Sequence, residues 1–419
     1  MNKYQKAVTA AVTAGTLLLQ SFMPIFAATI IISGNGTDSD NTADVELNHS
    51  VSVTQSNYAD VKNDVDASAT TGKNEAEGNT GGDVSIETGS ADTTVNVSND
   101  LNKNVANVDC CGATDFEVEI SGNGKDSDNK VDLDYNEKTS AVTVSQENYA
   151  DVENDIDATS STGKNEAEDN TGGNVSIETG AATTEVTVGT AANVNSARVG
   201  GGSSQGGSVS ALIMGNGKDS DNKIDLDLLS WVELDQANYA DVDNDIDAAA
   251  YTGKNEAEDN TGGEVSIETG KADVTVEVDN SVNFNFADAD CGCLLEDLLV
   301  KIFGNGVDSE NEIEAEIGSG LSVDQSNCGS EEKKSEDCEL DNDVDAFAGT
   351  GLNEAEDNTG EPGDDPSIET GAAASTVELG NSGNTNVYGA SDDWELPGFD
   401  FNLNFSFSLS ELLDLLGLN

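Results

Sequence analysis

The sequence predicts an all-β protein, a β-solenoid or β-helix built from four repeats of about 90 residues. One observation behind this prediction is a block of sequence that is written four times. Another is a regular alternation of side-chain types, which is typical of β-strands. The marker Thr-Gly-Lys-Asn-Glu-Ala-Glu begins at Thr71, Thr162 and Thr252, and recurs with Leu in place of Lys from Thr350. The marker Gly-Asn-Gly-x-Asp-Ser-Asp-Asn begins at Gly34, Gly122 and Gly215, and recurs with Glu in place of the second Asp from Gly304.

The alternation is clearest over residues 51–69, where odd positions hold Val, Ala, Asn or Gln and even positions are mostly polar. As one straight strand this segment would span about 60 Å, whereas strands usually have about 5–6 residues. We therefore expect it to turn a corner without losing phase. The 88 residues 34–121 also divide into four segments of 22, which suggests coils stacked on one another. Buried Asn and Gln are tolerable there, because stacked amides bond to the copies above and below.

The rival fold is a string of immunoglobulin-like or cadherin-like β-sandwiches, for which 90 residues is a suitable length. The block offers one recurring aromatic residue, at Tyr58, Tyr149 and Tyr239, and no Trp common to the repeats. A sandwich core normally needs larger side chains than Val and Ala. The solenoid is favoured, and the sandwich remains the alternative.

The domain organisation follows from the repeats and from two atypical ends. Lys3 and Lys6 precede an apolar stretch over residues 7–26, followed by the small residues Ala27 and Ala28, so we expect a secretory signal peptide. An uncleaved anchor is the alternative, and no later stretch has the roughly 18 apolar residues of a membrane helix. The expected segments are signal peptide 1–28, repeats 29–121, 122–195, 211–303 and 304–390, a Gly/Ser-rich loop or linker 196–210, and a C-terminal segment 391–419.

In the C-terminal segment, large apolar residues alternate with polar ones. A solenoid exposes an edge and a core at its ends, so a cap is one expectation. The other is a self-association or anchoring segment that pairs with another subunit. The apolar positions are Phe399, Phe401, Leu403, Phe405, Phe407 and Leu409.

The charge is strongly negative, with 82 Asp and Glu against 17 Lys and Arg, a net charge of −65. Nucleic acid is excluded as a partner, because binding phosphate needs cationic side chains. Self-repulsion opposes compaction, so salt, divalent cations or an extended shape must offset it.

The cysteines predict at least one disulfide in a secreted chain. Cys328 and Cys338 bracket an insertion, 328–338, in the fourth repeat, and a bond between them would contribute roughly 2–3 kcal/mol. Four others, at the ends of repeats one and three, could pair locally, with each other or between chains, or bind a metal. They are Cys110, Cys111, Cys291 and Cys293.

Closely spaced Asp and Asn recur in every repeat and are candidate Ca²⁺ ligands, because Ca²⁺ takes 6–8 oxygen atoms. The spacing lacks the Gly and bidentate Glu of an EF-hand. Weak cation condensation and a solvated acidic face are the alternatives. The main set is Asp38, Asp40, Asn41, Asp126, Asp128, Asn129, Asp219, Asp221, Asn222, Asp308, Glu310 and Asn311. A second set is Asp60, Asn63, Asp64 and Asp66, with its counterparts in repeats two and three.

The sequence does not predict an enzyme. His49 is the only histidine, so no His-based triad recurs with the repeat, and no nucleophile elbow, phosphate loop or zinc motif is present. Paired carboxylates are the one catalytic option, in glycoside hydrolysis. No cofactor other than Ca²⁺ is expected.

The segment with Gln55, Asn57, Ala59 and Val61, and its counterparts from Gln146 and Gln236, resembles the curlin repeat. Curlins are secreted bacterial subunits that form β-solenoid fibres at the cell surface. The chain departs from that family in its acidity and its long repeat. The resemblance implies a structural or adhesive role at the bacterial surface or in extracellular matrix. The alternatives are a calcium-dependent adhesin of tandem domains and a polysaccharide-binding or polysaccharide-active solenoid. A surface polysaccharide or protein is the expected partner.

Overall fold

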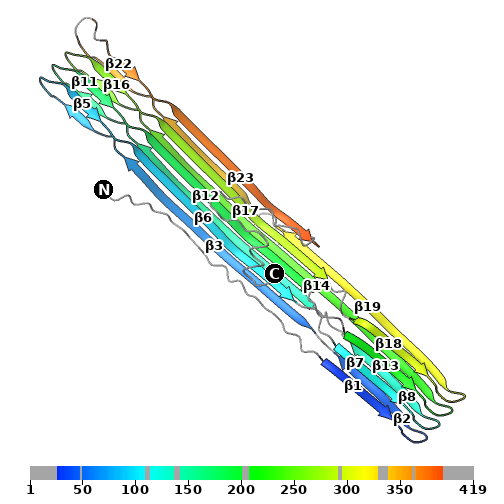
Figure 1. Ribbon diagram of the computed structural model, residues 1–419. Helices are drawn as coiled ribbons and strands as arrows, with labels where there is room; N and C mark the ends of the chain where they lie inside the picture. Colours follow the sequence, from blue (N-terminus) through cyan, green and yellow to red (C-terminus); the bar gives the residue numbers. More distant parts are fainter. Residues whose placement is uncertain are drawn as a thin grey trace.

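A computed structural model describes residues 26–47, 50–108, 114–135, 142–200, 207–290, 295–328, 338–360, 363 and 365–389. All regular structure in these residues is β, and the strands pair in parallel to give one long, narrow body (Figure 1). The predicted all-β solenoid is therefore confirmed.

Each repeat forms a single flattened coil. Each coil begins with a short strand and a turn. The chain then runs along two strands in line, turns at a tip made of two short strands, and returns along a long strand that leads into the first strand of the next coil (Figure 1). Coil 1 consists of β1 (Phe26–Ser33), β2 (Asp40–Leu47), β3 (Val51–Thr70), β4 (Glu75–Glu77), β5 (Val84–Glu87) and β6 (Ala91–Val108).

The other three coils repeat this path. Coil 2 consists of β7 (Thr114–Ser121), β8 (Asp128–Tyr135), β9 (Val142–Ser161), β10 (Glu166–Glu168), β11 (Val175–Glu178) and β12 (Ala182–Gly200). Coil 3 consists of β13 (Gly207–Met214), β14 (Asp221–Tyr251), β15 (Glu256–Glu258), β16 (Val265–Glu268) and β17 (Ala272–Asp290). Coil 4 consists of β18 (Leu295–Phe303), β19 (Glu310–Asn327), β20 (Leu340–Gly349), β21 (Glu354–Glu356), β22 (Ser367–Glu369) and β23 (Ala373–Tyr388).

Every sheet takes its strands from the four coils in order, as in β6-β12-β17-β23. The register places equivalent residues beside one another, so that Val51 pairs with Val142 and Val142 with Val232. Because each strand bonds to its counterpart in the next repeat, no repeat makes a sheet of its own. The tandem-sandwich alternative is therefore wrong.

The long strands do not turn a corner, contrary to our expectation. β3 and β9 each run for 20 residues and β14 runs for 31. Residues 51–69 lie within β3, which pairs with β9 along its whole length. Pairing on this scale satisfies the backbone of a strand much longer than usual. One coil therefore uses the whole repeat, and the segments of 22 residues are not separate coils.

The predicted linker is shorter than residues 196–210. Residues 196–200 belong to β12 and pair with β17, and residues 207–210 belong to β13. Residues 201–206 lie outside the described residues, as do 1–25 and 390–419, which hold most of the predicted signal peptide and C-terminal segment. β1 begins at Phe26, inside the predicted signal, so the cleavage position stays a prediction.

The two long sheets are the one that contains β3, β9 and β14 and the one formed by β6, β12, β17 and β23. The core between them is made of small side chains and amides. Val186, Val188 and Val276 pack at its centre and are fully buried. Next to them, amides stack in ladders, as predicted. Asn148 donates to Asn238 in the next coil at 3.0 Å and to Asn195 across the core at 2.8 Å. Each buried amide therefore replaces its lost water contacts with copies of itself.

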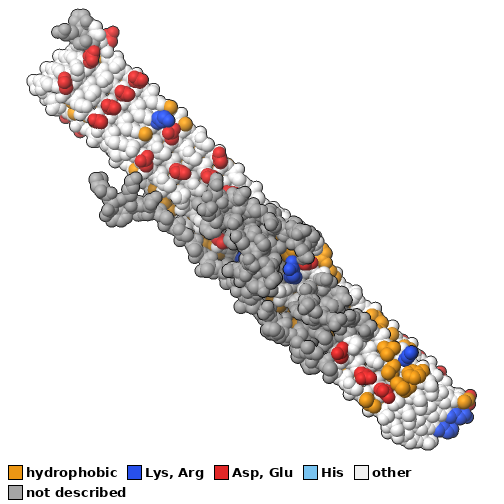
Figure 2. Space-filling model, in the orientation of Figure 1, with side chains coloured by type: hydrophobic (Ala, Val, Ile, Leu, Met, Phe, Trp, Pro, Cys, Tyr) orange, Lys and Arg blue, Asp and Glu red, His pale blue; other side chains and the backbone are white. Residues whose placement is uncertain are grey.

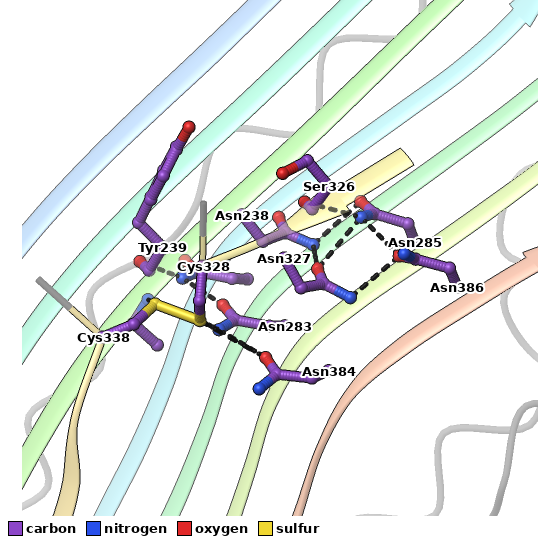
Figure 3. Close-up of a disulfide and its surroundings, with 12 residues drawn as sticks. Asn238, Tyr239, Asn283, Asn285, Ser326, Asn327, Cys328, Cys338, Asn384 and Asn386 are labelled. Atoms are coloured by element: carbon purple, nitrogen blue, oxygen red, sulfur yellow. Dashed lines mark hydrogen bonds between the residues drawn. A yellow bond between two sulfur atoms is a disulfide. The ribbon is translucent and has the colours of Figure 1, made fainter. Parts of the chain in front are cut away.

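The insertion in coil 4 is closed by a disulfide, as predicted. Cys328 and Cys338 are bonded, with their Cα atoms 5.4 Å apart (Figure 3). β19 ends opposite Asn238 and β20 resumes opposite Val242, so the two strands stay in line along β14. Residues 329–337 lie outside the described residues, as do Cys110, Cys111, Cys291 and Cys293.

Candidate cation-binding columns of carboxylates

In-register stacking turns an outward acidic position that recurs in every repeat into a column across the coils. Carboxylates in a column are separated by the spacing of strands, about 4.8 Å. Rows of acidic side chains cross the narrow dimension of the body (Figure 2). One column, here the Asp64 column, is Asp64, Asp155, Asp245 and Asp343, and another, the Asp66 column, is Asp66, Asp157, Asp247 and Asp345.

The carboxylates of a column repel one another, because they carry the same charge. Partial burial, followed by the charges of Asp247, Asp66 and Asp155, raises the pKa of Asp157. Partial burial and the charges of Asp155 and Asp343, with those of other nearby acids, raise the pKa of Asp245. The carboxylates of Asp157 and Asp245 are thus driven toward a proton or a bound cation.

The main predicted calcium set is separated by the fold. Its asparagines point into the core: Asn129 accepts from Asn41 at 2.8 Å and donates to Asn222 at 3.0 Å. Asn222 in turn donates to Asn311 at 3.0 Å. Asn63, from the second set, donates to Asn154 in the same way, at 2.7 Å. The amides of Asn41, Asn129 and Asn222 therefore lie inside and bond to one another, away from the aspartates next to them in the chain, because strand alternation puts every second residue inside.

The aspartates of the turn between the first two strands of a coil are paired with lysines. Lys125 contacts Asp126 at 2.7 Å and Asp219 at 3.6 Å, and Lys218 contacts Asp219 and Asp308, each at 3.4 Å. An ammonium group therefore already lies between successive members of this column. Asp38 occupies the same turn position in coil 1, with φ at 57°.

The second acidic residue of the Gly-Asn-Gly-x-Asp-Ser-Asp-Asn marker forms a column of carboxylates. Asp40, Asp128, Asp221 and Glu310 pair in register on the outer face. Burial, followed by the charges of Asp221 and Asp40, raises the pKa of Asp128. The predicted set thus supplies one column rather than a compact site with several ligands from one loop.

Among the described residues, a cluster of carboxylates lies at the tip of the coils, and it was not predicted as a site from the sequence. Carboxylate oxygens of Glu168, Glu256 and Glu258 lie within 4.8 Å of one another. β10 and β15 position them, with Ala167 and Ala257 buried between the two glutamates of each strand. Burial, a hydrogen bond with Glu166 and neighbouring glutamate charges raise the pKa of Glu168 to about 7. We call Glu166, Glu168, Glu256 and Glu258 the tip glutamates.

The signal for this cluster was the Glu-Ala-Glu end of the repeat marker. Two glutamates with one residue between them face the same side of a strand, and stacking doubles them. Such a cluster can share a proton between carboxylates or hold a hard cation such as Ca²⁺ through oxygen ligands.

A hollow of about 370 Å³ lies where coils 3 and 4 approach the tip. The rings of Tyr251 and Phe347 have centroids 5.3 Å apart, and the ammonium of Lys254 lies 5.2 Å from the Tyr251 ring. Leu352, which replaces the marker lysine, completes the lining and is 81% exposed. An apolar hollow with one cation stands out on this acidic surface.

The described residues contain no helix that is long and apolar enough to span a membrane. Comparison of the chain with protein-family models, with curated proteins and with solved structures finds no match.

Proposed function

We propose that the protein is a secreted rod that does structural or adhesive work at the bacterial cell surface or in extracellular matrix. The observation that supports this most is the extent of the two long sheets. Strands of up to 31 residues, stacked in register over four coils, give reach and stiffness rather than an enclosed reaction site. The large polyanionic face suits hydration, spacing and cation-mediated contact.

Location is tested by fractionating the producing cells and sequencing the N-terminus of the protein by mass spectrometry. We expect the chain in the surface or medium fraction, starting near residue 29. A chain that keeps residue 1 and stays in the cytoplasm would refute the proposal.

Divalent cations belong to the same proposal. The tip glutamates and the aspartate columns are held at strand spacing by the backbone ladders, so they cannot separate to relieve repulsion. Ca²⁺ bound between them would offset that repulsion and stiffen the rod. Calcium is therefore the proposed inorganic partner, and the tip glutamates are its proposed ligands.

Thermal unfolding separates specific binding from screening. The melting temperature would be measured by circular dichroism in EDTA, in Ca²⁺, and in NaCl of matched ionic strength. We expect Ca²⁺ to raise it further than NaCl, and Glu168→Gln with Glu258→Gln to reduce that excess. Glu185→Gln is the matched control, because Glu185 is exposed and its register partners are Thr94 and Thr275. An equal rise in NaCl would eliminate calcium and leave screening of the charge.

Polysaccharide binding is a second candidate function, favoured by the Tyr251–Phe347 hollow. Aromatic rings beside an open hollow offer apolar faces to sugar rings, and Lys254 offers a cation to acidic sugars. Binding of acidic and neutral oligosaccharides would be measured by calorimetry for the native chain and for Phe347→Ala. Loss of binding in the variant supports this function, and no binding to the native chain rejects it.

A further inference from the structure

In the part of the chain that the structure describes, coil 4 has an open edge along its strands. In the described chain its strands have a partner on one side only, and its inward side chains are uncovered. Val377 and Leu379 on β23 are 42% and 51% exposed, whereas their register partners Val276 and Val278 on β17 are 0% and 1% exposed. Ile313 on β19 is 49% exposed, against 0% for its partner Ile224. The difference lies in the neighbour: β17 is covered by β23, and β23 is not covered.

The amide ladders have a direction, so the two ends of the stack differ. In the ladder that starts at Asn102, the NH₂ group of one coil donates to the amide oxygen of the next, from Asn102 to Asn193 and from Asn193 to Asn283. The glutamine ladder runs the other way, because Gln146 donates to Gln55 and Gln236 donates to Gln146. Asn384 in coil 4 accepts from Asn283 at 3.1 Å, so its NH₂ group faces away from coil 3. At the other end, the Asn102 oxygen faces away from coil 2. In the ladder from Asn102 to Asn384, coil 4 thus presents an amide donor and coil 1 presents an amide acceptor.

Glycines at both ends fit a neighbouring coil that one chain lacks. A Cβ on Gly253 would lie 1.9 Å from the Gly351 carbonyl oxygen of the next coil, and a Cβ on Gly124 would lie 2.4 Å from the Gly36 backbone. Inside the stack, only glycine is therefore tolerated. Gly351 at the coil 4 edge and Gly36 at the coil 1 edge have nothing within 4 Å of a Cβ, and neither has a positive φ. Among the described residues of one chain, no contact or backbone strain demands glycine at these two positions.

We propose that the coil 4 edge of one chain stacks on the coil 1 edge of a second copy, in the register that joins successive coils within a chain. Val377 would then pair with Val95 of the second copy, and Leu379 with its Val97. The ladder would continue from Asn384 to Asn102 of that copy, and Gly351 would face its Gly72. The disulfide keeps β19 and β20 in line, so the edge keeps this register on both sides of the insertion.

Such contacts are head-to-tail and do not close, so they lead to filaments. Each chain would add four coils, about 19 Å at the usual strand spacing. Stacking also extends the acidic columns, so we expect association to require salt or divalent cations that screen the charge of −65. The proposal does not depend on where the protein works, since it concerns only the two edges.

The test uses two variants, Gly351→Val and Gly36→Val, followed by sedimentation velocity and electron microscopy over a range of protein and NaCl concentrations. The native chain should form rods that lengthen with concentration. Each variant should stay monomeric, with unchanged circular dichroism and melting temperature, because both Cβ positions are open in one chain. Mixing the two variants should restore one junction and give dimers only, because each variant keeps one intact edge.

Leu352→Lys is the matched control, because the other coils carry Lys73, Lys164 and Lys254 at this exposed position, with the same positive φ. It should assemble like the native chain. Association that persists in both glycine variants would overturn the proposal, as would a native chain that stays monomeric at high salt. A monomeric chain that assembles only when residues 391–419 are removed would also overturn it, since the tail would then occupy the edge.

Discussion

Asn63 and Asp64 are neighbours on β3, and the two columns that start from them behave in opposite ways. Inside, Asn63, Asn154 and Asn244 are linked by hydrogen bonds of 2.7 and 2.6 Å. Outside, Asp64, Asp155 and Asp245 stack in the same register, and the charge of Asp155 disfavours the ionised form of Asp245. An amide is both donor and acceptor, so copies of it bond to one another, whereas an ionised carboxylate is acceptor only. Stacking therefore stabilises the fold at a position that carries an amide and opposes it at a position that carries an ionised carboxylate.

Replacing a core amide by a carboxylate should have the largest effect on stability. Asn154→Asp would place a carboxylate at a fully buried site, facing the Asn244 oxygen to which Asn154 now donates at 2.6 Å. We expect the free energy of unfolding at neutral pH to fall by about 3 kcal/mol or more, since a buried charge loses its solvation and a donor is lost. Denaturant unfolding measures this.

Acid should partly rescue Asn154→Asp, because a protonated acid can donate to Asn244. The control is Asn96→Asp, which makes the same change at an exposed position of β6. Equal losses of stability in the two variants would contradict the distinction between inside and outside.

An intermediate effect is expected from pH at the tip glutamates. The pKa of Glu168 is raised from 4.5 to about 7, so the folded state holds this proton more tightly than the unfolded state. The stabilisation is complete below about pH 4.5 and is lost as the pH rises through about 7. The melting temperature should therefore fall over this window, and less steeply in Glu168→Gln. An equal fall of the melting temperature with pH in the native chain and in the variant would contradict the raised pKa of Glu168.

The smallest effect is expected from removing one charge outside. Asp157→Asn keeps the shape of the side chain and relieves repulsion with Asp66 and Asp247 in its column. We expect a gain of a few tenths of a kcal/mol at low salt, shrinking as NaCl is added. Chemical denaturation at two ionic strengths measures it. A loss of stability would mean that Asp157 makes a favourable contact that the amide cannot make.

The fold class could be predicted from the sequence because the repeat and the two-residue alternation are both visible in the order of the residues, without knowledge of which residues are in contact. The same alternation assigned Gln55 and Asn57 to the inside, where they join amide ladders. It should also have placed Asn41 inside, but Asn41 was grouped with Asp38 and Asp40 by closeness in sequence. Adjacent residues of a strand face opposite sides, so closeness along the chain misled the metal assignment.

The sequence by itself determined the repeat, the strand character, the amide ladders, the acidic face and the Cys328–Cys338 pair. Only the tertiary structure decided that one repeat makes one coil, because strand length depends on a partner that runs beside the whole strand. It also decided which carboxylates converge, since the tip glutamates come from residues about 90 positions apart. Finally, it alone distinguished coil 4 from coil 3, because nearly the same inward residues are buried only where another coil lies on top.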